Sequence, residues 1–492
     1  MSSETESVAL QDAAIVVLLR DPEHPQVLIA RRNFKQRFLG GYHAFAGGRL
    51  DPQDRAVEIR GASGEEALFR AVALRELLEE TGVLIGAESD PALRRRLRAG
   101  LLESRPLAEL LQAEGLTLSA APLVRCGRWV TPPFSPRRYH TWVFLAWLPA
   151  DQDVEVTGEL EEPAWQTAAE ILERWERSEI LLAPPTLLTL RALAEGVDDA
   201  AERLERLTTA HGRPILKLPF RPDLMLFPQR TPTRPPATHT NAYLLGRRRL
   251  LVVDPGSTSL EELEPLAEEI QNRLSNGAEL EAVLVTHHHP DHCGGVGLLA
   301  QRFGAKVAAH PETARRLEGR FPIEQTLAGG ELLDLGDSRW EALHTPGHAP
   351  GHLCLRNTGT GDLLSGDLIA GAGSVMIDPQ EGDMEAYLAA LERLAALELR
   401  VLFPAHGPPV ASAQRQVQAY LRHRRWRESR ILSVLGAQPI TLAQIVQAAY
   451  DDVDPQLHDL AERTTLAHLI KLQREGAILH EGSSFRVARD AR

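Results

Sequence analysis

Cysteine and long hydrophobic runs are both scarce in this sequence. Its 492 residues include three cysteines, Cys126, Cys293 and Cys354, too few for a disulfide framework, so we expect reduced thiols in a reducing compartment. No apolar stretch reaches the roughly 20 residues that a membrane helix requires. Residues 1–11 are polar and acidic and lack the basic start and small-residue cleavage site of a secretory leader. We therefore expect a cytoplasmic protein without a membrane partner.

The sequence also lacks an excess of positive charge. Its formal net charge of -13 argues against wholesale nucleic-acid binding, although it leaves room for a local basic groove. The composition, 43% hydrophobic and 25% charged, is ordinary for a soluble globular protein. A chain of 492 residues exceeds what one hydrophobic core supports, so two or three domains are expected. Nothing in the sequence indicates an oligomeric state.

One stretch concentrates groups that bind metals. Residues 286–295 read Thr-His-His-His-Pro-Asp-His-Cys-Gly-Gly and follow an apolar run, 282–285, that predicts a buried strand. The loop beyond this strand holds four candidate ligands: His287, His289, Asp291 and His292. Neutral imidazole suits zinc, and a carboxylate can share a second ion. Clustering these groups without a metal would bring no packing benefit, so we favour a metal site over a histidine-rich surface loop.

Three later segments complete the set. His348 follows Thr-Pro-Gly, Asp367 follows Leu-Leu-Ser-Gly, and His406 lies in Pro-Ala-His-Gly, each where an apolar run gives way to glycine or proline. In order, His-x-His-x-Asp-His, Thr-Pro-Gly-His, Gly-Asp and Ala-His-Gly resemble the ligand series of the metallo-β-lactamase superfamily. The resemblance implies that one ion is held by His287, His289 and His348 and the other by Asp291, His292 and His406. Asp367 would then bridge the two ions.

Such a site predicts hydrolysis. A water between two zinc ions loses its proton near neutral pH, which provides a nucleophile without serine or cysteine. The substrate class stays open among esters, thioesters, amides and phosphodiesters, and we count Asp291 as a catalytic residue as well as a ligand. Two Zn²⁺ are the expected cofactors, with iron and manganese as alternatives because the same ligands accept all three.

A helix predicted over 68–82 carries a second cluster of acidic residues. Glu76, Glu79 and Glu80 stand at i, i+3 and i+4, so they share one face and repel one another. A cation such as Mg²⁺ would absorb that repulsion, whereas the alternative is a solvated acidic face. Gly48, Asp54 and the run from Arg75 to Val83 resemble the Nudix box, which favours the cation.

The box departs from the common pattern. Twenty residues separate Asp54 from Arg75, and aspartate stands where glutamate is usual. The insert, residues 129–139 and the apolar run 141–147 resemble the Nudix branch that includes a peroxisomal coenzyme A diphosphatase. The resemblance implies that the three glutamates and the carbonyl of Gly48 hold Mg²⁺, that Glu76 and Glu79 are catalytic, and that Arg75 orients the carboxylates. It also implies phosphate binding by two arginines that could instead be simply solvated, Arg137 and Arg138.

The remaining segments set the domain organisation. Residues 160–195 show an amphipathic helical pattern, and a proline-dense stretch follows. After His406 the order helix, helix, helix, hairpin is typical of a winged helix, similar to the C-terminal domain of lactamase-like relatives of a mitochondrial endoribonuclease. We read the arginine cluster 422–427 as a solvated face with partners such as Glu428 rather than as a nucleic-acid groove.

The expected fold is therefore multidomain, α/β and α+β. A Nudix α/β/α sandwich occupies 8–195, a linker 196–214, a metallo-β-lactamase αβ/βα sandwich 215–410, and a winged-helix domain 411–492. The function predicted is a bifunctional metal-dependent hydrolase of small-molecule substrates: nucleotide or coenzyme A type diphosphates in the first half, and an ester, thioester or phosphodiester in the second. The alternatives are a zinc-dependent endoribonuclease acting on RNA with a binding-only or decayed Nudix domain, and a binding or regulatory protein.

Overall fold

The computed structural model describes residues 9–36, 39–131, 135, 137–210, 216–235 and 237–488. The chain forms two compact units, Met1–Pro222 and Asp223–Arg492, and each is described by itself. Each unit has its own hydrophobic cores, as expected for a chain that is too long for one core.

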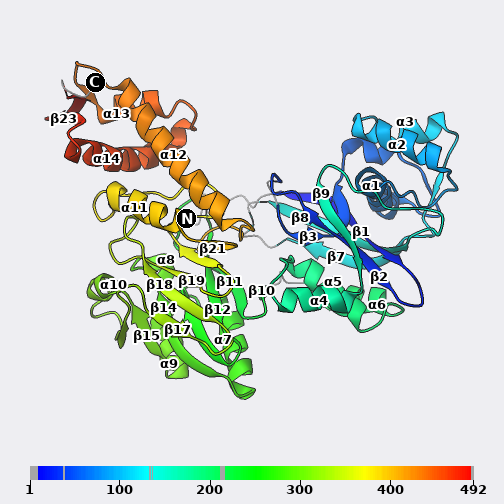
Figure 1. Ribbon diagram of the computed structural model, residues 1–492, viewed down its shortest axis with the longest axis horizontal. Coiled ribbons are helices and arrows are strands. Elements are labelled where there is room, and N and C mark those ends of the chain that lie inside the picture. Colours follow the sequence, from blue (N-terminus) through cyan, green and yellow to red (C-terminus); the bar gives the residue numbers. More distant parts are fainter. Residues whose placement is uncertain are drawn as a thin grey trace. The chain divides into compact units, whose positions relative to one another are not determined.

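The first unit is built on a seven-stranded mixed sheet (Figure 1). Its central strand is β1, which pairs in parallel with β8 and antiparallel with β4 and β2. The members of the sheet are β1 (Leu10–Arg20), β2 (Gln26–Arg32), β3 (His43–Ala44), β4 (Ala46–Arg49), β7 (Val124–Val130), β8 (Arg138–Trp147) and β9 (Leu160–Gln166). A short parallel pair, β5 (Ile59–Arg60) with β6 (Leu118–Ser119), and the turn η1 (Pro52–Ala56) lie outside this sheet.

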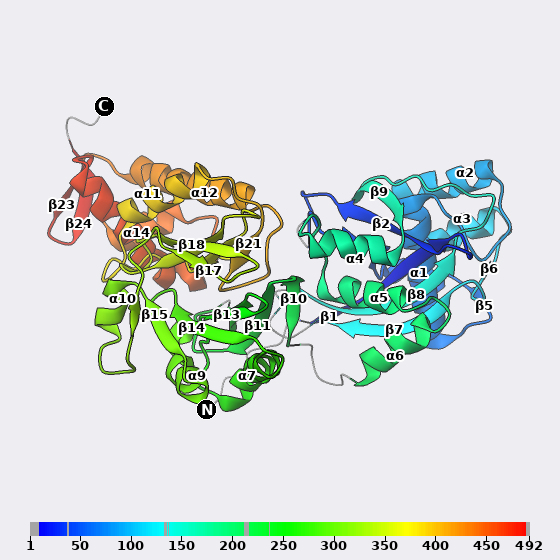
Figure 2. The same ribbon diagram turned by 60° about the horizontal axis from the view of Figure 1, so that its bottom comes forward.

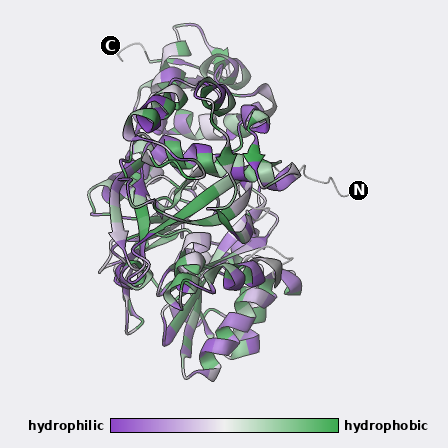
Figure 3. Cartoon of the chain, turned by 90° about the vertical axis from the view of Figure 1, so that its right-hand side faces the viewer, coloured by the Kyte–Doolittle hydropathy of each residue, from purple (hydrophilic) through white to green (hydrophobic). Residues whose placement is uncertain are grey.

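Alternation along the strands gives this sheet two buried faces. In β1, Val16 and Leu18 belong to one core, whereas Val17 and Leu19 belong to the other. Helices α1 (Gly64–Thr81), α2 (Pro91–Leu102) and α3 (Leu107–Ala113) pack in the first core, and α4 (Ala168–Glu176), α5 (Pro184–Ala194) and α6 (Ala200–Ala210) pack in the second. The predicted α/β/α sandwich is confirmed (Figure 1). Helices of the chain carry both hydrophilic and hydrophobic residues, as expected for helices with one buried face (Figure 3).

Two segments differ from the sequence interpretation. Residues 160–166, predicted as part of a helical region, form β9, because Trp165 pairs with Leu28 of β2 and this antiparallel pairing satisfies the backbone. Helix α6 lies within the interval 196–214 that we predicted as a linker, and its buried Ala200 and Leu204 join the second core. Apolar packing therefore makes this part of the interval a piece of the first unit.

The second unit contains two facing sheets, each covered by helices on its outer side (Figure 2). The first sheet runs β11 (Leu224–Arg230), β12 (His239–Leu245), β13 (Arg249–Val253), β14 (Glu279–Val285), β15 (Lys306–Ala309), β16 (Gln325–Thr326). The second runs β17 (Leu332–Asp334), β18 (Arg339–His344), β19 (Leu353–Asn357), β20 (Leu363–Gly366), β21 (Leu402–Pro404). Strand β10 (Leu218–Arg221) ends the first unit.

Each sheet has its own core. Helices α7 (Leu260–Ser275) and α9 (Val296–Phe303) pack on the first sheet, and α11 (Met384–Ala395) and α12 (Ala413–Val434) pack on the second. Hydrogen bonds join the sheets: Asn241 donates from its backbone to the carbonyl of Ala405, and Tyr243 donates to the carbonyl of Pro404. This αβ/βα arrangement confirms the predicted sandwich and brings strand ends from both sheets to one edge.

The last part of the chain has the predicted order of a winged helix. It consists of α12, β22 (Ile440–Thr441), α13 (Leu442–Ala449), η2 (Pro455–Leu457), α14 (His458–Arg474) and the hairpin β23 (Ile478–Glu481) and β24 (Ser484–Val487). Helix α12 is continuous between two cores, since Val417 and Tyr420 pack with the second sheet while Ile431 packs with α13 and α14. The winged helix is thus joined to the sandwich by an uninterrupted helix.

Candidate metal centres

The histidine-rich loop follows β14, as the apolar run predicted. His287 and His292 are fully buried, and Pro290–Cys293 form a single turn of helix, α8. Strand β13 runs parallel to β14 and ends beside it, so Asp254 lies at the same edge of the sheet. The buried Asp254 adopts a left-handed backbone conformation (φ 50°), and its carboxylate accepts hydrogen bonds from the backbone N–H and hydroxyl of Thr286 at 2.7 and 2.6 Å.

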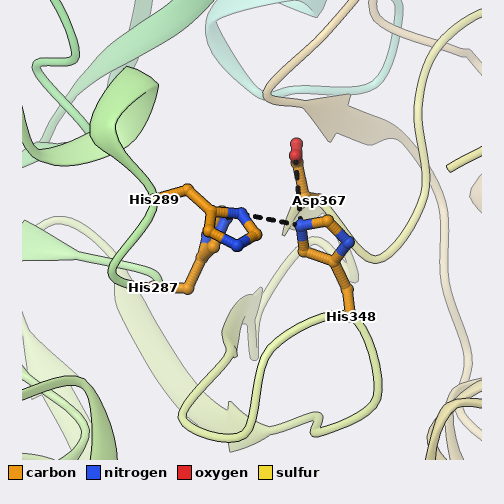
Figure 4. A group of neighbouring side chains, drawn as sticks. All are labelled: His287, His289, His348 and Asp367. Atoms are coloured by element: carbon orange, nitrogen blue, oxygen red, sulfur yellow. Dashed lines mark hydrogen bonds and ion pairs between the residues drawn. The ribbon is translucent and has the colours of Figure 1, made fainter. Parts of the chain in front are cut away.

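Three imidazoles from two loops converge on one point (Figure 4). Nδ1 of His289 lies 2.9 Å from Nε2 of His287 and 3.0 Å from Nε2 of His348. Asp367, directly after β20, places Oδ2 3.6 Å from Nε2 of His348. These four residues, predicted from separate motifs, form a group whose ligand atoms all lie within 4.8 Å of one another.

A second group adjoins the first. Oδ2 of Asp291 lies 3.4 Å from Nε2 of His406 and 3.9 Å from Nε2 of His292. The other oxygen of Asp367, Oδ1, lies 3.2 Å from Nε2 of His406 and 3.5 Å from Nε2 of His292. Asp367 therefore faces both groups, which is the geometry that a bridging carboxylate requires.

The opposite ring nitrogens show which atoms face the centre. Nδ1 of His348 donates to the carbonyl of Met376, and Nδ1 of His406 donates to the carbonyl of His239, each at 2.9 Å. Because a carbonyl only accepts, these rings carry the proton on Nδ1 when neutral and point a lone pair on Nε2 at the cluster. Nδ1 of His292 lies 2.8 Å from Oδ2 of Asp254. Metal-binding histidines usually have such a hydrogen-bond partner on the ring nitrogen that faces away from the metal.

Two ring nitrogens at this centre are buried without a hydrogen-bond partner among the described residues: Nε2 of His292 and Nε2 of His406. Burying polar atoms without a partner is costly, and a cation would complete both. The local charges point the same way. Burial lowers the pKa of His406, but the adjacent Asp367 and Asp291 outweigh it and raise the pKa to about 10. The carboxylates thus favour positive charge where a cation would lie.

In the first group, burial determines the pKa values of the histidines. It lowers the pKa of His348 to about 4 and that of His287 well below its ordinary value. These imidazoles are neutral at physiological pH, which is the form that binds a metal.

His352 is a buried histidine that the predicted ligand set did not include. Its Nε2 accepts a hydrogen bond from the backbone N–H of Asp367 at 3.0 Å, and its Nδ1 lies 2.8 Å from the hydroxyl of Thr345. Gly366 has φ 48°, and a Cβ there would lie 2.6 Å from Nε2 of His352. The glycine before Asp367 is therefore required, and His352 fixes the backbone that carries the bridging carboxylate.

Sequence reasoning also missed Asp254 and Glu381. Asp254 had a usable signal, since it ends a strand next to the histidine loop's strand in a parallel pair. Glu381 had none, because it lies in an irregular segment between β20 and α11. Its carboxylate lies 2.7 Å from Nε2 of His289 and 2.8 Å from Nε2 of His288.

Replacing Asp254 with asparagine is expected to weaken the binding of one metal ion by about 10- to 100-fold, the usual effect of losing a partner behind a ligand. The amide has no negative charge to offer His292, and its NH₂ group replaces one of the two oxygens that face the backbone and hydroxyl of Thr286 and Nδ1 of His292. Competition with a coloured chelator measures the affinity. Asp334→Asn, at an exposed ion pair with Arg339, is the matched control, and an unchanged affinity in Asp254→Asn would contradict the assignment.

The first unit holds the second predicted site. Helix α1 begins at Gly64, four residues before its predicted start, and ends at Gly82 in the left-handed conformation. Arg75 forms a bidentate pair with Asp54 (2.7 and 3.0 Å) and contacts Glu76 at 2.8 Å and Glu79 at 3.4 Å. Arg75 thus lies where an orienting residue was predicted, and Asp54 anchors it despite the twenty-residue insert.

Strand β4 lies against the glutamates. Oε2 of Glu80 accepts a hydrogen bond from the backbone N–H of Gly47 at 2.7 Å. A Cβ on Gly48 would lie 2.3 Å from Oε1 of Glu76, so a larger residue there would displace the carboxylate of Glu76. Burial, reinforced by Glu79, raises the pKa of Glu76 to about 7, and burial with the neighbouring Glu76 raises that of Glu80 to about 8.

The three glutamates are less convergent than the histidine clusters. They are not among the described groups whose ligand atoms all lie within 4.8 Å of one another. Of the predicted phosphate-binding arginines, Arg137 directly precedes β8 and is exposed, whereas Arg138 begins β8 and donates from Nε to the carbonyl of Thr131. The raised pKa values of the adjacent buried carboxylates Glu76 and Glu80 are nevertheless typical of functional sites.

Glu80→Gln is expected to remove part of the stability that the first unit loses as the pH rises from about 4.5 to about 8. The carboxyl ionises near its ordinary 4.5 when unfolded and at about 8 when folded, so between these values the folded state binds more protons and loses stability as pH rises. Calorimetry in EDTA at pH 6 and pH 8 measures how much the melting temperature falls between the two values in the wild type and in the variant. Each kcal/mol of unfolding free energy corresponds to ~2–4 °C. Mg²⁺ should raise the pH 8 melting temperature of the wild type more than that of the variant; identical pH dependence in the two would refute this account.

The arginine cluster of α12 is paired with neighbouring groups. Arg427 is buried, contacts Asp452 at 2.8 and 3.0 Å and lies over the ring of Tyr450. Arg425 pairs with Glu392, and Arg430 pairs with Asp451, both at 2.6 Å. Carboxylate partners were predicted and are present, but Glu428, named as one of them, pairs with His468 and Lys471. The prediction of a solvated face is wrong for Arg424 and Arg427, which are buried. The paired arginines still fit a nucleic-acid groove poorly.

Three family profiles match the chain. They are "Metallo-beta-lactamase superfamily" over residues 235–406, "Beta-lactamase associated winged helix domain" over 441–486 and "NUDIX domain" over 9–99. Within the described residues, no helix combines the length and hydrophobicity that a membrane crossing needs.

Several curated proteins are similar to part of the chain. The "Lactamase-like protein adaB" of Aspergillus niger is 30% identical over 201 residues, covering 40% of this chain and 58% of adaB. The "Atrochrysone carboxyl ACP thioesterase" of Aspergillus fumigatus is 29% identical over 206 residues, covering 40% of this chain and 59% of that protein. The chain thus spans under two thirds of the length of these two relatives.

Solved structures resemble each half. A metallo-beta-lactamase family protein from Thermus thermophilus is 26% identical, covers 54% of this chain and 99% of its own, and has a TM-score of 0.45. A NUDIX hydrolase from Alicyclobacillus acidocaldarius is 29% identical, with 40% and 96% coverage and a TM-score of 0.35.

The fold and the His/Asp clusters define the class: a multidomain protein of hydrolase families whose second half fits a dinuclear metal site. The chain combines a NUDIX domain, a metallo-beta-lactamase superfamily domain and a beta-lactamase associated winged helix domain, as the sequence motifs predicted.

Proposed function

We propose that the chain is a bifunctional metal-dependent hydrolase whose second half cleaves thioesters at a dinuclear zinc site. The observation that carries the proposal is Asp367, which faces two groups of buried histidines, two of whose ring nitrogens have no hydrogen-bond partner among the described residues. Among the ester, thioester and phosphodiester substrates open to this chemistry, the thioester is favoured by the similar protein that is named a thioesterase.

In this proposal the ligands divide as the family resemblance implied. His287, His289 and His348 hold one Zn²⁺, Asp291, His292 and His406 hold the other, and Asp367 serves both. Bound zinc ions would supply Lewis acidity and a water of lowered pKa. In the metal-free protein burial raises the pKa of Asp291, but His292 and His406 outweigh it and lower the pKa to about 2, so Asp291 is ionised before any metal binds. The ionised carboxylate can orient a water by accepting its hydrogen bond.

The first half, in the same proposal, hydrolyses a diphosphate of nucleotide or coenzyme A type with Mg²⁺. Glu76, Glu79 and Glu80, with the carbonyl of Gly48, would hold the cation, and Glu76 or Glu79 would take the proton of the attacking water. The contacts of Arg75 with Glu76 and Glu79 support its orienting role. A lesser element of the proposal is that Arg137 and Arg138 bind substrate phosphate.

The substrates proposed are small molecules, because the arginines that would form an RNA groove on α12 have carboxylate partners. The three free cysteines are all buried, which supports a reducing, cytoplasmic location.

A substrate panel tests the proposal. Full-length protein is assayed with acyl-coenzyme A thioesters, p-nitrophenyl esters, single-stranded RNA, coenzyme A and ADP-ribose, in Zn²⁺ and Mg²⁺ separately. We expect zinc-dependent release of free thiol from thioesters and magnesium-dependent cleavage of a diphosphate. Zinc-dependent cleavage of RNA without thioester turnover would replace the proposal with an endoribonuclease.

A further inference from the structure

One irregular segment touches the first group of histidines, those that converge with Asp367. This acceptor loop, residues 375–383, lies between β20 and α11. The carbonyl of Met376 accepts from Nδ1 of His348 at 2.9 Å, and Glu381 lies 2.7 Å from Nε2 of His289. Asp383 donates its backbone N–H to the carbonyl of Gly347, directly before His348, at 2.8 Å.

These contacts set the orientation of two of the three imidazoles. A hydrogen bond from Nε2–H of His289 to Glu381 leaves a lone pair on Nδ1, the atom that faces His287 and His348. The second group is held differently, because its acceptors, Asp254 and the carbonyl of His239, belong to the first sheet and the turn after it. The acceptor loop therefore serves one ion of the proposed pair and not the other.

The winged-helix domain holds the same loop from its other side. On α14, Arg463 pairs with Asp378, and Arg474 pairs with Asp383 at 2.5 Å. The buried Thr464 accepts from the backbone N–H of Ile377 at 3.4 Å. Apolar packing reinforces these bonds, since Ala467 of α14 shares a core with Val375 and Ile377 of the loop.

Helix α12 adds a further contact. Its buried Arg424 donates to the carbonyl of Val375, at the start of the loop, and lies over the ring of Tyr387. The loop thus lies between the histidines of the first group and two helices of the winged-helix region, and both sets of bonds involve the same short segment.

We propose that the winged-helix domain acts as a clamp on the acceptor loop and thereby sets the affinity of the ion held by His287, His289 and His348, leaving the other ion unaffected. This inference rests on the dinuclear site proposed above and assigns the domain a role besides any binding of substrate. Arg463 and Arg474 act through the loop, so they are positioning residues.

The expected change in the rate of zinc release depends on how exposed the two arginines are. Arg463 and Arg474 are about half exposed, and single exposed ion pairs contribute little. Reversing both charges replaces two attractions with two repulsions against Asp378 and Asp383. We expect Arg463→Glu/Arg474→Glu to release one of two zinc ions about tenfold faster, at the lower end of the 10- to 100-fold effect of losing a direct partner of a ligand.

The experiment uses the full-length protein loaded with Zn²⁺ and follows zinc transfer to a coloured chelator. The double variant should show one accelerated and one unchanged phase. Arg463→Lys/Arg474→Lys should restore wild-type release, and Glu381→Gln, which removes the carboxylate charge that faces His289, should accelerate the same phase. Arg430→Glu, which breaks the pair with Asp451 away from the loop, should change neither phase. Adding His406→Ala to the double variant should remove the unchanged phase, because His406 belongs to the second group.

The outcomes separate the two claims. Wild-type release from the double variant, with a faster phase in Glu381→Gln, would overturn the clamp and leave the dinuclear site intact. Equal acceleration of both ions would also overturn it, because the effect would not be selective. Wild-type protein that binds no zinc would overturn the proposed function itself. Thr464→Val, which removes the acceptor of Ile377 without a change of charge, repeats the test if the double variant does not fold.

Discussion

Asp367→Asn is expected to lower thioester hydrolysis by roughly a thousandfold, because the removed charge belongs to the carboxylate that faces both histidine groups. Its oxygens lie 3.2 Å from His406, 3.5 Å from His292 and 3.6 Å from His348. Stabilising charge with metal ions contributes several kcal/mol, and about 1.4 kcal/mol corresponds to tenfold in rate. Asparagine keeps the size of the side chain and the hydrogen bond between the backbone N–H and His352.

The measurement is steady-state release of free thiol, with metal content determined on the same sample. Asp334→Asn serves as control, since it removes the same charge from an exposed ion pair in the same domain and should leave turnover unchanged. A variant at Asp367 that keeps more than a tenth of wild-type turnover would show that the clusters are not the hydrolytic site.

Glu79→Gln is expected to lower diphosphate hydrolysis by at least about a hundredfold while leaving thioester hydrolysis unchanged. The glutamine cannot offer a charged oxygen to Mg²⁺ or accept a proton, and a general base alone contributes about 10²- to 10⁴-fold. Glu79 lies on the face of α1 that Arg75 contacts, at 3.4 Å, and its side chain is a third exposed, so the substitution disturbs no core packing.

Glu65→Gln is the matched control, because Glu65 is an exposed residue in the first turn of the same helix. Its diphosphatase activity should equal that of the wild type. Full diphosphatase activity in Glu79→Gln would show that the reaction does not depend on Glu79, which would support a Nudix site that is decayed or only binds. A parallel loss of thioester turnover would show that the two halves are not independent sites.

The clustering of the proposed metal ligands in the second half was predictable because each one follows a short apolar run. The runs before His287, Asp367 and His406 become β14, β20 and β21, and strands in such sandwiches end at a common edge. Local motifs therefore identified residues that lie far apart in the sequence and close together in the fold.

The partners behind those ligands were not predictable in the same way. Glu381 and the carbonyl of Met376 lie in a segment without periodicity, and their positions depend on the tertiary contacts of α14 with that segment. The buried His352 was visible in the Pro-Gly-His repeat, but its bond to the backbone of Asp367 depends on the left-handed turn at Gly366.

The helical interpretation of residues 160–166 was wrong for a related reason. Spacing of apolar residues from Trp165 to Ile180 matches a helix, and α4 confirms this from Ala168 onward. Before that point, pairing with β2 outweighs the local pattern, since Trp165 lies opposite Leu28 and Gln166 lies opposite Val27. Strand pairing between distant segments leaves little trace in the local sequence.

Metal content of the purified full-length protein tests the central claim most directly. The account predicts about two transition-metal ions per chain, bound without added Mg²⁺, and at most one in Asp367→Asn. Inductively coupled plasma mass spectrometry gives the number and the element. A preparation that hydrolyses thioesters at full rate with no transition metal bound would contradict the account.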